Sequence, residues 1–242
     1  MTQNSAPPSR SFPKLLLMLC ALSLFTALKV HSQDWPNLAQ FRAANDSLPP
    51  PADGENRVVF MGNSITIGWL DKVPEFFRGK PYINRGISGQ TTPQMLLRFR
   101  QDVIDLRPKV VVILAGTNDI AGNTGPMTLE QIMDNLKSMA ELARANGIEP
   151  VLSSVLPAYD YPWRPGLEPN VKIPRLNAMI KAYAGANDLV YLDYFSAMAD
   201  ARNGLDKTLA TDEVHPTVKG YQMMAPLAEA AIAKALEKGR GQ

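Results

Sequence analysis

The run Lys109–Ala115 (KVVVILA) constrains the fold of this chain more than any other feature of its sequence. Between the lysine and the alanine it holds only valine, isoleucine and leucine. A strand with one solvated face alternates apolar and polar side chains, so an unbroken aliphatic run is typical of a strand buried on both faces of a parallel sheet. A sheet of that kind needs helices over both of its faces.

Strand and helix patterns alternate along the rest of the chain. Further strands are expected at 57–61, 82–84, 150–156 and 188–193, and helices at about 65–77, 92–105, 128–146, 173–185 and 217–238. The alternation predicts an α/β sandwich with a mostly parallel sheet and right-handed crossovers. Ligands of such sheets bind beyond the carboxyl ends of the strands, so residues that carry chemistry are expected there.

The first 32 residues have the pattern of a secretory signal peptide. Arg10 and Lys14 precede the apolar run Leu15–Leu28, whose 14 residues are fewer than the roughly 20 that span a bilayer. Suitable residues at the −3 and −1 positions place the cleavage after Ser32, which predicts a secreted or periplasmic protein. An uncleaved anchor is the alternative. The residues before Cys20 lack the small side chains of a lipidation motif.

Removal of residues 1–32 would leave 210 residues, a length that suits one domain. We expect an N-terminal lead-in over 33–56 and a single domain over 57–242. Within the lead-in, the residues spaced as a short helical stripe are Trp35, Leu38 and Phe41. The Pro-rich stretch 47–54 cannot form regular structure.

The same removal changes the side chains available for chemistry. The remaining chain has 22 basic and 23 acidic residues, no cysteine, and His215 as its only histidine. Near-neutral charge gives no basic face for nucleic acid. A metal site with two or more histidine or cysteine ligands is excluded, and any histidine chemistry belongs to His215. No membrane contact of the mature chain is expected, and the sequence does not indicate an oligomeric state.

Ser64 follows the first expected strand, after Gly62 and Asn63. The glycine permits a sharp turn, and the serine then opens a helix at its positive end, where a developing negative charge is favoured. The alternative is that Ser64 only caps the helix. Thr66 excludes the Gly-x-Ser-x-Gly signature of the ordinary α/β hydrolases.

Two further segments follow strands. Gly86 and Gly89 lie three residues apart after the second strand, where backbone N–H groups can approach a ligand closely, although a plain tight turn is the alternative. Asn118 follows the strand at 109–115 within Gly116-Thr117-Asn118-Asp119. Its amide can stabilise a developing oxyanion, and an Asn-Asp turn is the alternative.

A fourth segment, Asp212-Glu213-Val214-His215, lies near the C-terminus. A spacing of three lets a carboxylate hold the imidazole of His215 and set its tautomer, so that the histidine can act as a general base toward a serine. A lone histidine with a structural role is the alternative. The three preceding strand-end segments favour the catalytic interpretation.

These segments occur in the order and spacing of the four sequence blocks of the SGNH (GDSL-type) hydrolases. Over about residues 55–238 the chain resembles the single-domain secreted esterases of that family and is similar to its platelet-activating-factor acetylhydrolase subunit branch. The resemblance implies a three-layer α/β/α, flavodoxin-like fold with about five parallel strands. The family usually has aspartate before the serine, whereas this chain has Asn63. Asparagine keeps an acceptor oxygen at that position but lacks the negative charge.

The resemblance also implies roles for individual residues. Ser64 would be the nucleophile and His215 its base, oriented by Asp212, with Glu213 as a less favoured orienting acid. The oxyanion hole would consist of the Ser64 N–H, the Gly89 N–H and the Asn118 side chain. Such a site needs no metal and no organic cofactor.

The segment 157–171 is long for a connection and rich in aromatic residues. We expect it to overhang the site, with Tyr159, Tyr161 and Trp163 either stacking on sugar faces or anchoring the segment. Substrate contacts are predicted for Asn63, Tyr159 and Trp163. Trp69, in contrast, is expected to pack in the core.

The resulting hypothesis is a serine esterase that removes short acyl groups, above all acetyl, from a small-molecule or polysaccharide ester. Arg85 and Arg164 could bind an acidic sugar, although solvation at the surface is the favoured role of both. The alternatives are a lipid or lysophospholipid esterase, a broad aryl- or thioesterase, and a non-catalytic carbohydrate-binding protein.

Overall fold

Five parallel strands form one sheet in the computed structural model, which describes residues 1 and 34–239. The chain separates into two units, Met1–Asp34 and Trp35–Gln242, and the sheet belongs to the second. The strands are β1 (Val58–Gly62), β2 (Tyr82–Gly86), β3 (Val110–Leu114), β4 (Glu149–Ser153) and β5 (Val190–Leu192). Their order is β2-β1-β3-β4-β5, so the aliphatic run at β3 occupies the centre, and it is buried on both faces as predicted.

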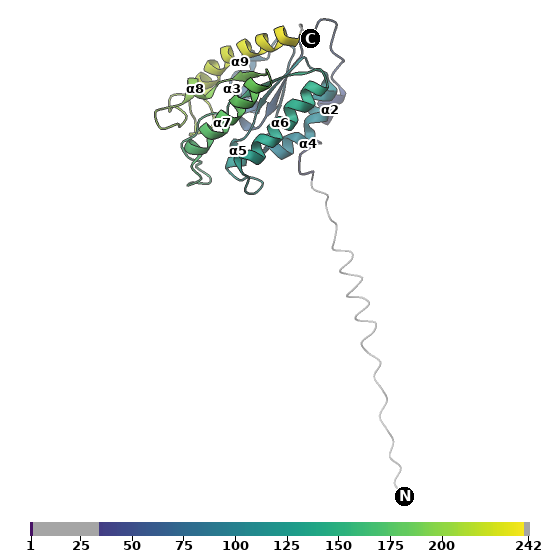
Figure 1. The fold of residues 1–242 in the computed structure, drawn as a ribbon. Coiled ribbons are helices and arrows are strands. Elements are labelled where there is room, and N and C mark those ends of the chain that lie inside the picture. The colour runs from purple at the N-terminus through teal and green to yellow at the C-terminus, as the bar shows by residue number, and fades with distance from the viewer. Residues whose placement is uncertain (2–33, 240–242) are drawn as a thin grey trace. The chain divides into compact units, whose positions relative to one another are not determined.

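Helices cover both faces of this sheet (Figure 1). Alternate residues of each strand divide between two hydrophobic clusters, as the two-residue period of a strand requires. One cluster packs against α4 (Thr92–Asp102), α6 (Leu129–Ala145) and α7 (Pro169–Ala186). The other packs against α3 (Ser64–Lys72) and α9 (Val218–Gly239). The predicted three-layer α/β/α sandwich is therefore confirmed.

Short elements complete the described chain. They are α2 (Arg42–Asp46), the 3₁₀ turns Pro74–Phe76 and Ile104–Leu106, α5 (Thr117–Ile120) and α8 (Phe195–Met198). The predicted helix over 65–77 ends early, because the chain turns away at Val73 before Pro74 opens a 3₁₀ turn. The predicted helix over 173–185 begins earlier, at Pro169, because proline is tolerated in a first helical turn.

The lead-in differs from its prediction. Trp35, Leu38 and Phe41 lie in turns rather than on a helical stripe, and Trp35 is exposed. The segment is attached by its backbone instead: Gln94 donates to the Trp35 carbonyl, Gln101 to the Leu38 carbonyl and Gln90 to the Pro36 carbonyl. The predicted signal peptide and its cleavage site lie outside the described residues. In the part that is described, no helix is both long and apolar enough to cross a bilayer.

Candidate active site

Ser64 stands at the point where β1 turns into α3. Gly62 ends the strand in a space where a Cβ atom would lie 2.0 Å from Thr66 Oγ1. Asn63 caps the helix, since its Oδ1 accepts a hydrogen bond from the Ile65 N–H at 3.0 Å. The alternative in which Ser64 is the cap is therefore wrong. The predicted substrate contact of Asn63 gains no support, because that side chain is 1% exposed and faces the helix end.

The hydroxyl of Ser64 meets His215. His215 Nε2 lies 2.9 Å from Ser64 Oγ, although 151 positions separate the two residues. On the opposite side of the ring, Nδ1 lies 2.9 Å from Asp212 Oδ2 and 3.0 Å from Asp212 Oδ1. Serine, imidazole and carboxylate thus form one hydrogen-bonded chain at the carboxyl edge of the sheet.

Hydrogen bonds within the loop before α9 fix this acid and base relative to each other. The His215 N–H donates to Asp212 Oδ1 at 2.8 Å, and both the N–H and the hydroxyl of Thr211 donate to the His215 carbonyl. Asp212, and not Glu213, is the carboxylate hydrogen-bonded to the His215 ring. The helix behind the loop is joined to α3 by the hydroxyl of Tyr221, which donates to the Ile65 carbonyl at 2.8 Å.

The surroundings of Asp212 favour its charged form. Partial burial raises the pKa of its carboxyl, but the His215 N–H, the imidazole and the Val214 N–H lower it by more, so the net pKa lies below the ordinary value. A carboxylate that stays ionised can stabilise a protonated imidazole beside it.

Two further predicted residues lie on adjoining loops. Asn118, near the start of α5, donates through Nδ2 to the Gln90 carbonyl at 2.9 Å. Gly89 has φ +76°, in the left-handed region that favours glycine, and its carbonyl accepts from Asn123 Nδ2. Within residues 34–239 the N–H groups of Ser64 and Gly89 have no acceptor, and the second Asn118 amide proton is also without one.

Arg98 connects the chain segments around the site through its hydrogen bonds, a role that the sequence did not predict. This fully buried side chain donates to Gln90 Oε1 at 2.6 Å, to the Arg85 carbonyl at 2.9 Å and to the Gly62 carbonyl at 3.1 Å. Its charge is paired with Asp102, also fully buried, at 3.0 Å. The available signal was an arginine and an aspartate four residues apart on the apolar face of a predicted helix.

Asp119 is a second buried group that the sequence did not single out as chemical. Its Oδ1 accepts from the N–H and the hydroxyl of Thr92, whereas Oδ2 has no partner. Burial raises the pKa of this carboxyl, and the two Thr92 bonds offset part of the rise. Through its two hydrogen bonds with Thr92, Asp119 connects α5 to the start of α4.

The aromatic segment 157–171 does overhang the site. Trp163 is 47% exposed, and its ring centroid lies 6.5 Å from that of His215. Tyr161 is fully buried beneath it, stacks on it at 5.2 Å and bonds to the Thr117 hydroxyl. Tyr159 is 41% exposed. Tyr161 therefore anchors the segment, whereas Tyr159 and Trp163 are exposed to solvent and their contact with substrate stays a prediction.

The two arginines considered for acidic sugars have structural partners. Arg85, expected at the surface, is buried: its guanidinium bonds to Asn45 and lies over the ring of Phe41. Arg164 is exposed but donates to the Ala121 and Gly122 carbonyls at 2.7 Å each. Trp69 packs in the core as predicted.

No group of three or more His, Cys, Asp or Glu side chains within the described ranges is placed to hold a metal ion. The groups that the structure brings together at the site are a serine hydroxyl, an imidazole, a carboxylate and amide donors.

Comparison with known proteins identifies the family. The model of the GDSL-like Lipase/Acylhydrolase family matches residues 60–223, a range that contains Ser64, Gly89, Asn118, Asp212 and His215. This chain belongs to the GDSL-like lipase/acylhydrolase family. As a GDSL-like hydrolase it is a carboxylic ester hydrolase.

Solved and curated relatives agree with this assignment. A Bacteroides fragilis protein described as an acylhydrolase has a TM-score of 0.82 and 47% identity, covering 84% of this chain and 99% of its own. Platelet-activating factor acetylhydrolase IB subunit alpha1 from Rattus norvegicus is 26% identical over 198 residues, 78% of this chain and 81% of the rat protein.

Two other relatives match over part of their length. Acetylxylan esterase from Xylanibacter ruminicola is 27% identical over 86% of the GDSL-like hydrolase, which spans 48% of that esterase. The lipoprotein YqeF from Bacillus subtilis is 37% identical over 121 residues, 43% of this chain and 50% of YqeF.

Proposed function

We propose that this GDSL-like hydrolase is a secreted serine esterase that removes acetyl and other short acyl groups from carbohydrates. The observation that carries the proposal is the hydrogen-bonded chain from Ser64 Oγ through the His215 ring to Asp212, with Trp163 beside it. A nucleophile and a base within hydrogen-bond reach, with the base oriented by a third group, are the signature of nucleophilic (covalent) catalysis, which ester hydrolysis by a serine uses.

In the proposed mechanism, Ser64 Oγ attacks the ester carbonyl carbon while His215 Nε2 takes the hydroxyl proton. Asp212 stabilises the imidazolium that forms. The C–O bond to the alcohol then breaks, and the alcohol leaves with the proton from His215. Water, activated by the same nitrogen, hydrolyses the acyl-serine and regenerates Ser64.

The oxyanion of the tetrahedral intermediate is assigned to the Ser64 N–H, the Gly89 N–H and the Asn118 amide. The proposal is supported by the lack of acceptors for these donors among residues 34–239. Donors held in place before the reaction stabilise the developing charge without reorganisation.

Acetyl as the acyl group is supported by the names of two relatives, an acetylhydrolase and an acetylxylan esterase. Carbohydrate as the alcohol part is favoured by the exposed ring of Trp163 beside His215 and that of Tyr159 in a pocket shared with Asp212, since aromatic faces suit the C–H faces of sugars. A lipid ester is the second candidate, because platelet-activating factor names the rat relative.

Hydrolysis of p-nitrophenyl acetate and p-nitrophenyl octanoate tests this function. We expect acetate to be the better substrate, and Ser64→Ala and His215→Ala to abolish most turnover while circular dichroism stays that of the folded protein. Preference for octanoate would favour the lipid ester. Turnover by His215→Ala near the wild-type rate would refute the assignment of the base.

Export is proposed from the N-terminal pattern of basic residues and an apolar run. Mass spectrometry of the protein from the medium or periplasm tests it, with a mature chain beginning at Gln33 expected. A lipid-modified chain beginning at Cys20 would instead make the protein a lipoprotein, and an intact N-terminus would show an uncleaved segment.

A further inference from the structure

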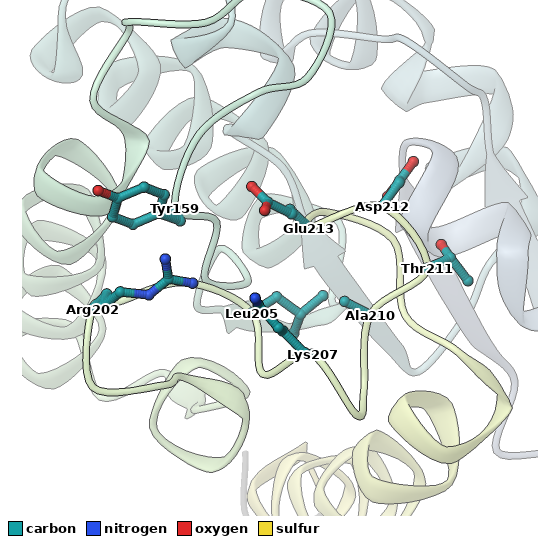
Figure 2. Close-up of a pocket in the computed structure, with 8 residues that line it drawn as sticks. All are labelled: Tyr159, Arg202, Leu205, Lys207, Ala210, Thr211, Asp212 and Glu213. Atoms are coloured by element: carbon teal, nitrogen blue, oxygen red, sulfur yellow. The ribbon is translucent and has the colours of Figure 1, made fainter.

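A pocket of about 240 Å³ begins at Asp212, the carboxylate that holds His215. Figure 2 shows Tyr159 and Arg202 on one side of it, Glu213 and Thr211 on the other, and Leu205 between them. We call this the Tyr159 pocket. The mechanism of ester cleavage makes no use of it.

One wall of the Tyr159 pocket is held in place. The Arg202 guanidinium lies 4.3 Å from the centroid of the Tyr159 ring, and its Nε and Nη2 donate to Asp200 Oδ2 at 3.2 and 3.1 Å. Asp200 is held in turn by the Gly204 N–H at 2.8 Å. Within residues 34–239 the remaining nitrogen, Arg202 Nη1, has no hydrogen-bond partner.

The rim carries groups of both signs without partners. Lys207 and Glu213 are exposed, and neither makes a hydrogen bond or an ion pair with any residue of the described chain. Glu213 has φ +66°, a conformation that is uncommon for a residue other than glycine. Residues other than glycine that are held in this conformation cluster at active sites and ligand-binding sites.

We propose that the Tyr159 pocket binds an uncharged pyranose unit next to the unit that carries the cleaved ester. The exposed part of the Tyr159 ring offers an apolar surface to the sugar, while Arg202 and Lys207 can donate to hydroxyls and Glu213 can accept from them. Because Lys207 and Glu213 bear opposite charges and Arg202 is already paired, the pocket does not select an acidic sugar.

The overhanging segment links this pocket to the reaction centre. Trp163, four residues after Tyr159, has its ring centroid 6.5 Å from that of His215. The segment 157–171 therefore places one exposed ring beside the reaction centre and another in the Tyr159 pocket. The inference rests on the proposed esterase function and narrows it, since the substrate becomes an oligosaccharide rather than a single sugar.

The test is the kcat/KM for partially acetylated xylose, xylobiose and xylotriose, with turnover of p-nitrophenyl acetate measured beside them. For the wild type we expect at least a tenfold rise from xylose to the longer substrates. Tyr159→Ala and Lys207→Ala should each reduce this ratio at least fivefold, mainly through KM. Lys234→Ala, which removes an exposed lysine of α9 outside the pocket, should keep the wild-type ratio.

Comparing the ratio within each variant cancels any loss of folded protein. A wild-type ratio near one would overturn the subsite while leaving the esterase intact. The same would follow if Tyr159→Ala and Lys207→Ala kept the ratio found in Lys234→Ala. Equal turnover of p-nitrophenyl acetate by the wild type and Ser64→Ala would instead refute the proposed function, and the subsite with it.

Discussion

Replacement of Arg98 by methionine is expected to destabilise the protein far more than replacement of the exposed Arg100 on the same helix. Methionine fills much of the space but removes the cation from Asp102 and the donors from Gln90 Oε1 and the Gly62 and Arg85 carbonyls. Asp102 keeps neutral donors, from Asn45 at 2.8 Å and Gln101 at 3.4 Å, and the charge of Arg85 still acts on it, but it stays fully buried without a bonded counter-charge.

The magnitude follows from the burial of the pair. Removing one partner of a buried ion pair costs about 3–5 kcal/mol. For a domain of this size each kcal/mol lowers the Tm by about 2–4 °C, so Arg98→Met should lower it by about 6–20 °C. Adding Asp102→Asn removes the unpaired charge and should recover part of the loss, with a coupling of about 0.5–3 kcal/mol.

Urea and thermal unfolding followed by circular dichroism measure these changes. The matched control is Arg100→Met, an exposed arginine two residues along α4, for which a change within about 0.5 kcal/mol is expected. A loss below about 1 kcal/mol in Arg98→Met, or additive losses when Asp102→Asn is combined with it, would show that the pair does not support the strand ends.

Three further predictions concern the loops, the packing and the charge of the site. Asn118→Ala should lower kcat for p-nitrophenyl acetate by about 10²–10³-fold, and a loss under fivefold would remove the residue from the oxyanion hole. Gly86→Ala should destabilise the fold, because its Cβ would lie 2.3 Å from Ile67 N. Gly185→Ala, in open space on α7, should instead stabilise the fold by roughly 0.5–1 kcal/mol. Chemical denaturation compares the two variants, and similar midpoints would contradict the packing argument. The native pKa of Asp212 is below its ordinary value of 3.8, so its contribution to stability is present above that pH and is lost as pH falls through the native pKa. The difference in free energy of unfolding between wild type and Asp212→Asn should shrink over that range, and a constant difference down to pH 2 would refute the shift.

The local pattern was sufficient for the layers and for the gathering of the segments that follow strands, whereas the contact of Ser64 with His215 was implied by the family resemblance as well. An all-aliphatic run is buried on both faces wherever it occurs, and the loops after parallel strands share one edge of the sheet. Both arguments need only the character of the segments. They therefore hold even though the predicted ends of two helices were wrong, near Val73 and near Pro169.

What the sequence could not show were the buried polar partners. Arg85 was expected at the surface, yet Asn45, 40 positions away, bonds its guanidinium. Asn63 was expected to contact substrate, yet its amide oxygen faces a helix end. A polar side chain has the same local pattern whether it faces water or a partner from a remote segment, so only the packed structure separates the two.

The loop before α9 has a consequence for how the enzyme would lose activity. Asp212 and His215 lie three residues apart and are bonded through both backbone and side chain, so this pair is assembled locally at little cost in chain entropy. The contact of His215 with Ser64 instead depends on the packing of two remote segments, the loop before α9 and the start of α3, which we call the α3–α9 seam. The hydrogen bond from the Tyr221 hydroxyl to the Ile65 carbonyl holds this seam together close by. Warming or mild denaturant that loosens this seam would separate nucleophile from base while the helices and the sheet persist. Inactivation is thus expected to run ahead of the loss of secondary structure, with esterase turnover as the more sensitive gauge of the native state.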